Sequence, residues 1–256
     1  MSNILKVRSI EIGAGKPKVV VSIIERNFKE IIAKALNLRE MQIDIIEWRA
    51  DFYDEISNLS RTLELLTELR SSLGEIPLLF TFRTKKEGGE KDISIEQYAN
   101  LNIAVATGGK ADLIDIEMFS DKDMVAKIIK TAHDAGTFVV GSNHDFNATP
   151  YKDEIIRRMI KMQEMDADII KIAVMPKCKK DVLTLLAATN EMHEYHAYCP
   201  IVTVSMAQEG IISRFSGEIF GSAMTFASVG STSAPGQIPV NDLVKILDIV
   251  HKYSVH

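Results

Sequence analysis

Cysteine is scarce in this chain, and its scarcity excludes several classes of protein. Cys178 and Cys199 are the only cysteines among 256 residues, and their spacing matches no metal-binding pattern. Two cysteines in a chain of this length are also too few for the disulfide framework of a small secreted domain. We therefore interpret both side chains as reduced thiols.

Long apolar runs and an excess of positive charge are missing as well. No segment approaches the roughly 18 apolar residues that a membrane span needs, and the N-terminal "MSNILKVRSIEIGAG" lacks the features of a signal peptide. The 35 acidic residues outnumber the 30 basic ones, and the net charge of -5 argues against a nucleic-acid-binding face. We expect a cytoplasmic protein without membrane or nucleic-acid partners, in which local arginines bind any anionic substrate.

What the chain does contain is a regular alternation of strand-like and helix-like segments. Hydrophobic residues make up 46% of the sequence, enough for a sizeable core. Eight short β-rich runs occupy residues 18–24, 43–50, 77–83, 112–119, 137–145, 168–175, 200–206 and 224–229. Apolar residues recur with helical spacing in the intervening segments 27–40, 59–73, 122–136, 151–165 and 181–195. No Pro/Gly/Ser-rich linker divides the chain, so we predict one α/β domain over residues 1–256, a (β/α)8 TIM barrel.

The segment before the first of these strands has the features of a β-hairpin. In "ILKVRSIEIGAGKPKVVVSI", two β-rich runs flank the turn residues Gly13, Gly15 and Pro17. We expect this hairpin to close the bottom of the barrel.

Charged and polar residues gather where the predicted strands end. The catalytic face of such a barrel lies at the carboxyl ends of its strands, and alternate residues of a strand share a face. A single lysine near a strand end is ordinarily a solvated residue or half of an ion pair. Five strands with such residues instead predict a shared polar site, from Glu47, Arg49, Arg83, Asp115, Glu117, His144 and Lys171.

Lys171 is the candidate nucleophile of this set. It lies between Ile170 and Ile172, with Ala173 next on its own face, and we expect these residues to form a desolvating wall. Desolvation disfavours the ammonium form, and a neutral lysine can attack a carbonyl to form a Schiff base. His144 ends the preceding strand; it is either a histidine hydrogen-bonded at a strand end or, beside such a lysine, a general acid and base.

The arginines and one loop indicate the type of ligand. Arg49, Arg83 and Arg214 are suited to a small carboxylate, because the guanidinium group binds a carboxylate through two parallel hydrogen bonds. Residues 228–239, "SVGSTSAPGQIP", are a candidate lid at the active end of the barrel or a linker to the last helix. We expect no metal site, since "HEYH" at His193–His196 has two histidines and no third ligand.

Longer motifs resemble one family over essentially the whole chain. They are "VVVSI", "IIEWRADF", "LLFTFRTKKEGGE", "LIDIEMF", "SNHDF", "KIAVMP", "ISRFSGEIFGSAMTF" and "SAPGQ", and together they resemble type I 3-dehydroquinate dehydratases. The resemblance implies a homodimeric (β/α)8 barrel that dehydrates 3-dehydroquinate to 3-dehydroshikimate in the shikimate pathway. It implies a lysine imine as the intermediate and neither a metal nor an organic cofactor.

The resemblance also implies a role for each site residue. Lys171 is similar to the imine-forming lysine, His144 to the base beside the imine carbon, and Glu87 to the carboxylate that orients the histidine. Arg214 corresponds to the carboxylate clamp. The other implied substrate contacts are Glu47, Arg49 and Arg83 in the pocket, Met206 on its wall, Ser22 at its base, and Ser233 and Gln237 in the lid.

Two other functions are compatible with a lysine in such a barrel. A lysine-imine aldolase would share the nucleophile, but it would normally bind a phosphorylated sugar, and no phosphate-binding glycine turn follows the seventh or eighth strand. A catalytically silent barrel that binds a carboxylate metabolite would not need both Lys171 and His144.

Overall fold

The computed structural model describes residues 4–230 and 232–254, in which a parallel sheet curls into a (β/α)8 barrel, as the sequence predicts. The sheet has nine strands in the order β11-β10-β3-β4-β5-β6-β7-β8-β9. The eight barrel strands are β3 (Lys18–Ile23), β4 (Ile45–Arg49), β5 (Leu78–Thr81), β6 (Leu113–Glu117), β7 (Phe138–Asp145), β8 (Ile169–Val174), β9 (Ile201–Ser205) and β10 (Met224–Ser228). The two-residue β11 (Ile238–Pro239) adds to the edge of β10.

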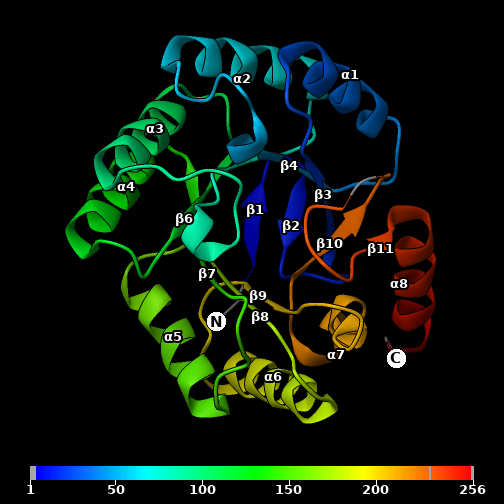
Figure 1. The fold of residues 1–256 in the computed structure, drawn as a ribbon. Coiled ribbons are helices and arrows are strands. Elements are labelled where there is room, and N and C mark those ends of the chain that lie inside the picture. The colour runs from blue at the N-terminus through cyan, green and yellow to red at the C-terminus, as the bar shows by residue number, and fades with distance from the viewer. Residues whose placement is uncertain (1–3, 231, 255–256) are drawn as a thin grey trace.

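Helices surround the strands in a ring (Figure 1). They are α1 (Phe28–Arg39), α2 (Leu59–Leu73), α3 (Ile95–Thr107), α4 (Lys122–Asp134), α5 (Lys152–Glu164), α6 (Lys179–Glu191), α7 (Gly217–Phe220) and α8 (Val240–Ser254). Helix α3 is not among the helices predicted from the sequence, although it begins with a complete capping box in which Ser94 and Gln97 each accept a hydrogen bond from the other's backbone N–H. Short helical turns follow three of the strands, namely η1 (Ala50–Phe52), η2 (Lys85–Glu87) and η4 (Ile211–Arg214), and η3 (Met192–His196) extends α6.

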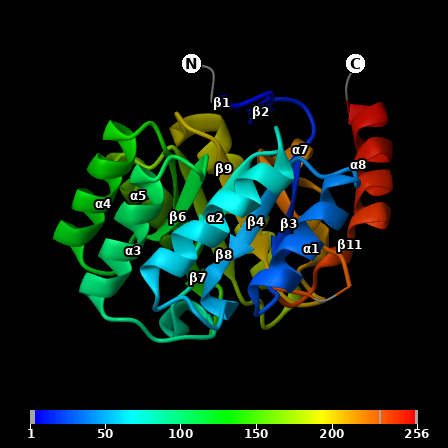
Figure 2. The same ribbon diagram turned by 90° about the horizontal axis from the view of Figure 1, so that it is seen from above.

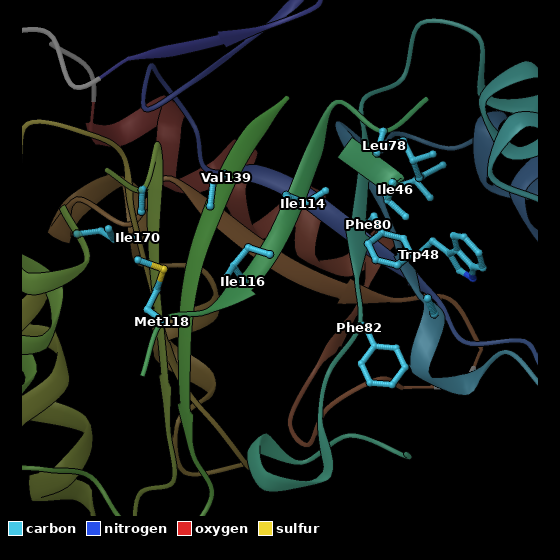
Figure 3. Close-up of a cluster of buried hydrophobic side chains, with 14 of the residues drawn as sticks. Ile46, Trp48, Leu78, Phe80, Phe82, Ile114, Ile116, Met118, Val139 and Ile170 are labelled. Atoms are coloured by element: carbon cyan, nitrogen blue, oxygen red, sulfur yellow. The ribbon is translucent and has the colours of Figure 1, made fainter. Parts of the chain in front are cut away.

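Alternation along the strands divides the apolar core in two. Ile46, Trp48, Phe80 and Ile114 belong to the buried cluster packed between the sheet and the helices (Figure 3). The residues between them point into the barrel, since successive side chains of a strand leave opposite faces. This division lets the strands bury charged residues inside the barrel while their other face remains apolar.

The N-terminal hairpin closes the barrel bottom, as predicted, but its turn lies elsewhere. Strands β1 (Leu5–Val7) and β2 (Ile10–Ile12) pair antiparallel around Arg8 and the residue after it, with Arg8 at φ 51°. The prediction of a turn at Gly13–Pro17 was wrong. Residues 18–23 form the barrel strand β3, so residues 13–17 lead into that strand and are not the turn of the hairpin.

The hairpin contributes apolar side chains to the lower core. Val7 and Ile12 are buried in one cluster with the first inward residues of the barrel strands, among them Val20, Ile45 and Leu79. Figure 2 shows the hairpin across one end of the barrel. The other end, where the strands finish, remains available for a site.

The barrel closes between β9 and β10 through few backbone contacts. Among the described residues, the pairing of this seam consists of a bridge between Ile201 and Ser222. The N–H of Ala223 donates to the carbonyl of Ile201 at 2.7 Å, and the Ser222 hydroxyl accepts from the N–H of Thr203 at 3.1 Å. At this position a serine hydroxyl therefore accepts the hydrogen bond that a backbone carbonyl of a neighbouring strand would otherwise accept.

Candidate active site

The side chains inside the barrel form an apolar layer next to the hairpin and a polar layer above it. The first inward residues, such as Val140 and Ile169, belong to the lower core. The next inward residues are buried and mostly polar, namely Ser22, Glu47, Thr81, Asp115, Ser142 and Lys171, with Val204 and Phe226 on the remaining strands. Buried charges need partners, so the contacts among these residues determine what the site can do.

Lys171 projects into this layer and faces two carboxylates. Its Nζ lies 3.3 Å from Oδ2 of Asp115 and 4.0 Å from Oε1 of Glu47, and the side chain is almost wholly buried. The face of the Phe226 ring lies below the ammonium group, with 4.3 Å from Nζ to the ring centroid. Both carboxylates and the ring face stabilise a cation at this atom.

Of the residues expected to form a desolvating wall beside Lys171, only Ala173 faces the pocket. Ile170 and Ile172 belong to the cluster between sheet and helices, so they point away from Lys171. Ala173 does lie on the pocket side, in a small apolar cluster with Val204 and Met206. The prediction was wrong for the two isoleucines because neighbouring residues of a strand face opposite sides.

Arg83 joins the carboxylates below the pocket into one network. Its Nη2 donates to Oδ1 of Asp115 at 2.7 Å, and its Nη1 donates to Oε1 of Glu117 at 3.2 Å and to the Ser142 hydroxyl at 3.0 Å. Burial disfavours the charged guanidinium, but Asp115 and Glu117 hold the pKa of Arg83 above its usual range.

Asp115 is held in its ionised form by this network. Burial alone would raise the pKa of Asp115, but the charges of Arg83 and Lys171 and the Ser142 hydroxyl lower it overall. The hydroxyl donates to Oδ1 at 2.6 Å, so Oδ2 remains directed at Lys171. Asp115 belonged to the strand-end set of the sequence, but its contact with Lys171 was not predicted.

His144 and Glu87 form a second buried pair beside Lys171. Oε2 of Glu87 lies 2.9 Å from Nδ1 of His144 and also accepts the backbone N–H of His144 at 2.9 Å. Burial, together with the charges of Arg83, Lys171 and Arg49, lowers the pKa of His144 well below its usual value. A neutral imidazole that donates its Nδ1–H to Glu87 has its lone pair on Nε2, where it can act as a base.

Burial raises the pKa of Glu87 to about 7, against the lowering effect of Arg83. The Nη1 of Arg83 is 3.7 Å from Oε2 of Glu87. The pair therefore titrates near neutral pH, and the state in which Glu87 is charged and His144 is neutral prevails above that value.

Two arginines line the upper part of the pocket with different partners. Arg49 makes two 2.8 Å hydrogen bonds to Asp51, a residue that sequence analysis did not find, and directs Nη1 toward the carbonyl of Ser233 at 3.4 Å. Arg214 is 2% exposed and donates from Nη2 to the carbonyl of Pro235 at 2.8 Å, while its Nε has no partner within the described residues.

Arg214 has no carboxylate within 4.0 Å among residues 4–230 and 232–254, so burial lowers its pKa to about 10. It is still a cation at neutral pH, with donors that the described chain leaves unused. An incoming carboxylate would supply the missing partner.

The loop of residues 228–239 lies over the pocket, with residue 231 outside the described part. The Ser233 hydroxyl donates to the Ser22 hydroxyl at 3.0 Å and accepts from Nε2 of Gln237 at 2.9 Å. At Gly236 the backbone has φ 78° and passes so close to Ala207 that an added Cβ would lie 2.2 Å from its carbonyl oxygen. Only glycine fits there, so the loop can approach the strand ends closely.

These residues enclose a pocket of about 530 Å³ including its open mouth. Ten predicted site residues line it, namely Glu47, Arg49, Arg83, Glu87, His144, Lys171, Met206, Arg214, Ser233 and Gln237. Ser22 lies beneath it and donates to Oε2 of Glu47 at 2.5 Å. Phe146 and Phe226 also line the pocket and were not predicted, although Phe226 could have been found from the alternation of β10.

Three further points concern the chain outside the pocket, namely metal-binding groups, membrane-spanning helices and the cysteines. Among the described residues, no group of three or more His, Cys, Asp or Glu side chains is placed to hold a metal ion. In the same part of the chain, no helix has the length and apolar character to cross a membrane. Cys178 is exposed and Cys199 buried, and both are free thiols.

Comparison with known proteins gives one family. Residues 19–254 match the model of the type I 3-dehydroquinase family. The chain is 49% identical over 252 residues to the 3-dehydroquinate dehydratase of Clostridioides difficile strain 630, covering 98% of this chain and 99% of that protein. It is 50% identical over 246 residues to the 3-dehydroquinate dehydratase of Escherichia coli O7:K1, covering 96% and 98%.

Solved structures agree with this result. The type I 3-dehydroquinate dehydratase of Clostridium difficile, crystallised with covalently modified comenic acid, superimposes with a TM-score of 0.97 over 100% of both chains at 49% identity. The 3-dehydroquinate dehydratase of Geobacillus kaustophilus has a TM-score of 0.95 at 36% identity, over 98% of both chains.

Proposed function

The chain belongs to the type I 3-dehydroquinase family, and we propose that it is a lyase that dehydrates 3-dehydroquinate to 3-dehydroshikimate through a lysine imine. One observation carries the mechanism: the Nζ of the buried Lys171 lines the same pocket as the hydrogen-bonded pair of His144 and Glu87. A nucleophile and a base on neighbouring strands are what an imine-dependent elimination requires.

Substrate binding begins with the carboxylate. Arg214 has unused donors in a buried position, so it is the group that gains most from a carboxylate partner. Glu47 and Arg49 line the pocket together with the apolar Met206 and are suited to the substrate hydroxyls. Arg83 also lines the pocket, but its hydrogen bonds to Asp115 and Glu117 give it mainly the role of holding the carboxylates in place.

The first covalent step joins Lys171 to the substrate. His144 accepts a proton from the Lys171 ammonium, and the neutral amine that results attacks the ketone carbon to form a carbinolamine. His144 then returns the proton to the carbinolamine hydroxyl, which leaves as water, and a protonated imine remains on Nζ. Asp115 and Glu47 already face this atom, so the iminium takes the place of the ammonium with the same charge at the same position. No new counter-ion has to move during the step.

Elimination then follows at the next carbon. Nε2 of His144 removes a proton beside the imine carbon, and the electron pair of the broken C–H bond moves into the iminium to form an enamine. The enamine expels the β-hydroxyl, which takes the proton back from His144 and leaves as water. Hydrolysis of the resulting conjugated iminium frees the enone product and the lysine.

Glu87 supports both halves of this proton transfer. Its carboxylate accepts Nδ1–H of His144 and so stabilises the imidazolium that forms when Nε2 takes the proton. Ser233 and Gln237, hydrogen-bonded to each other above the pocket, are suited to close over the bound substrate. The covalently modified acid in the Clostridium difficile structure is consistent with covalent chemistry in that relative.

Borohydride trapping tests the proposal directly. The protein is mixed with 3-dehydroquinate, reduced with borohydride, digested and mapped by mass spectrometry, with borohydride alone and Lys171→Ala as controls. We expect a reduced adduct on the peptide that contains Lys171 and formation of the enone before reduction. A folded, unmodified protein without turnover would indicate a silent binding barrel, and cleavage of a carbon–carbon bond would indicate an aldolase.

The remaining parts of the proposal concern the setting of the reaction. From the sequence we propose a single catalytic domain over residues 1–256 and a cytoplasmic location. From the family resemblance we propose a homodimer, a place in the shikimate pathway and no cofactor. Light scattering on the protein as it elutes from a size-exclusion column measures the oligomeric state. Full activity after extensive dialysis against a chelator would support the absence of a metal.

A further inference from the structure

A chain of hydrogen bonds leads from the outer helix α5 to the His144–Glu87 pair. Nη1 of Arg158 donates to Oδ1 of Asn143 at 3.0 Å, and Nδ2 of Asn143 donates to Oε1 of Glu87 at 3.1 Å. The other oxygen of Glu87 bonds the backbone and ring of His144. Neither Asn143 nor Arg158 lines the pocket, so any effect they have on catalysis passes through Glu87.

The direction of this chain follows from the chemistry of its members. An arginine has only donors, so it can bond only the oxygen end of the Asn143 amide. The amide then has to present its NH2 to Glu87, where a carboxylate accepts it. Arg158 thus determines which end of Asn143 faces Glu87.

Arg158 is itself held in place on α5. Its Nε donates to Oε1 of Glu154 at 2.8 Å, and its Nη1 lies 3.9 Å from Oδ2 of Asp145 at the end of β7. Since Asn143 lies between the inward-facing Ser142 and His144, its side chain leaves β7 on the helix side, where Arg158 can reach it.

We propose that Asn143, oriented by Arg158, is a positioning residue that keeps the Glu87 carboxylate ionised and aligned on His144. The inference rests on the proposed dehydratase function and assigns to that reaction two residues outside its pocket. Its basis is geometric, since Asn143 supplies the only hydrogen bond to Oε1 of Glu87 within the described residues.

The charges around Glu87 make this donor important. Burial and the nearby carboxylate of Glu117 on β6 favour the protonated acid, while Arg83, the Asn143 amide and the His144 backbone favour the carboxylate. Loss of the amide donor removes one of three stabilising groups and moves the titration of Glu87 to higher pH. A carboxylate in place of the amide would move it further, because like charges disfavour ionisation.

Four variants test the proposal on the intact protein. Asn143→Asp keeps the shape but turns the donor into an acceptor, Arg158→Met removes the orienting group, and Arg158→Lys keeps a donor for Oδ1. Arg157→Met is the matched control, because Arg157 also bonds Glu154 from α5 but its 67% exposed side chain makes no bond to Asn143. The readout is the pH profile of kcat and KM for 3-dehydroquinate.

We expect the acid limb of kcat to move up by about one pH unit or more in Asn143→Asp, as a hydrogen bond to a charged group implies, and by less in Arg158→Met. Arg158→Lys should restore much of the wild-type limb, Arg157→Met should match it, and KM should change little throughout. The proposal would be overturned if the acid limbs of Asn143→Asp and Arg158→Met coincided with that of wild type, or if these variants lost kcat equally at every pH.

The carboxyl titration of Glu87 gives a readout that does not depend on turnover. Protein labelled with ¹³C at the glutamate carboxyl carbon is titrated by NMR, and the Glu87 signal is assigned as the one missing in Glu87→Gln. We expect its midpoint to rise in Arg158→Met, an exchange at a partly exposed position that keeps the fold. An unchanged midpoint in Arg158→Met would overturn the proposed role of Asn143 and Arg158. If the midpoint rises in this variant but the wild-type protein has no dehydratase activity, only the proposed function is contradicted.

Discussion

The Nζ of Lys171 lies 3.3 Å from Oδ2 of Asp115, a carboxylate with no exposed surface. The second oxygen of Asp115 is occupied by Arg83 and Ser142, so its position does not depend on a ligand. The candidate nucleophile therefore faces a fixed negative charge throughout the proposed reaction. The iminium that forms on this nitrogen meets a counter-ion already in position.

Asp115→Asn should lower kcat much more than it changes KM. The amide keeps the shape but removes the charge opposite the iminium, and removal of one partner from a buried ion pair typically costs about 3 to 5 kcal/mol. We expect a roughly 10²-fold or larger fall in kcat and a lower melting temperature. Asp123→Asn, at an exposed position of α4, is the control. A wild-type kcat in the Asp115 variant would show that the counter-ion is not needed.

Lys171→Ala should abolish turnover while ligand binding remains measurable. The arginines and the lid do not depend on this side chain, but the imine cannot form without it. We expect kcat to fall by roughly 10⁴-fold or more, as for the loss of a nucleophile in other covalent catalysts. Calorimetric titration with the substrate provides the binding measurement. Turnover within tenfold of wild type would be incompatible with an imine on this residue.

The rate should fall as the pH drops through the titration of Glu87. Its pKa is raised by burial to about 7, so below that pH the carboxyl group is protonated and no longer stabilises the imidazolium of His144. We predict a kcat that increases with pH between 6 and 8. Glu87→Gln should lower kcat by roughly 10²-fold and remove this increase, because general acid–base catalysis contributes about that much. A pH limb that persists in the variant would belong to another group.

Arg214→Met should weaken substrate binding and stabilise the free protein. The buried guanidinium has no carboxylate partner in the described chain, and burial lowers its pKa to about 10, so at neutral pH the folded state has to bury an uncompensated charge. An apolar side chain of similar length removes that cost. Melting curves should show a higher midpoint in the variant without substrate.

The same variant should lose the clamp for the substrate carboxylate. Truncation of a buried charged partner costs roughly 2 to 5 kcal/mol, which corresponds to a KM at least about 30-fold higher. Addition of 3-dehydroquinate should then raise the melting temperature less than in wild type. An unchanged KM would mean that Arg49 holds the carboxylate instead.

Much of the barrel and its pocket could be predicted because both depend on a period of two along each strand. Lys171 and His144 are visible in the sequence as polar residues on one face of otherwise apolar strands. The same rule places Ile170 and Ile172 on the helix side and puts Asp115 on the same inner face as Lys171.

Other features depend on contacts between residues far apart in the sequence. The Asn143–Glu87 hydrogen bond joins residues 56 apart, and its geometry depends on how η2 folds over β7. The hairpin turn at Arg8 was missed because three-residue strands give too short a pattern to compete with nearby glycines and a proline. Such features follow from packing rather than from local preference.

The seam between β9 and β10 has a consequence for how the barrel opens. A closed ring of strands should exchange its amide hydrogens most readily where fewest backbone bonds have to break, and here that place is beside Ser222. The chain that crosses this seam carries Arg214 on η4, and Thr225 of β10 bonds the carbonyl of Arg214. Local unfolding at the seam would therefore displace the carboxylate clamp before it disturbed Lys171, so ligand occupancy should protect the amides of this seam more than those of β6–β8.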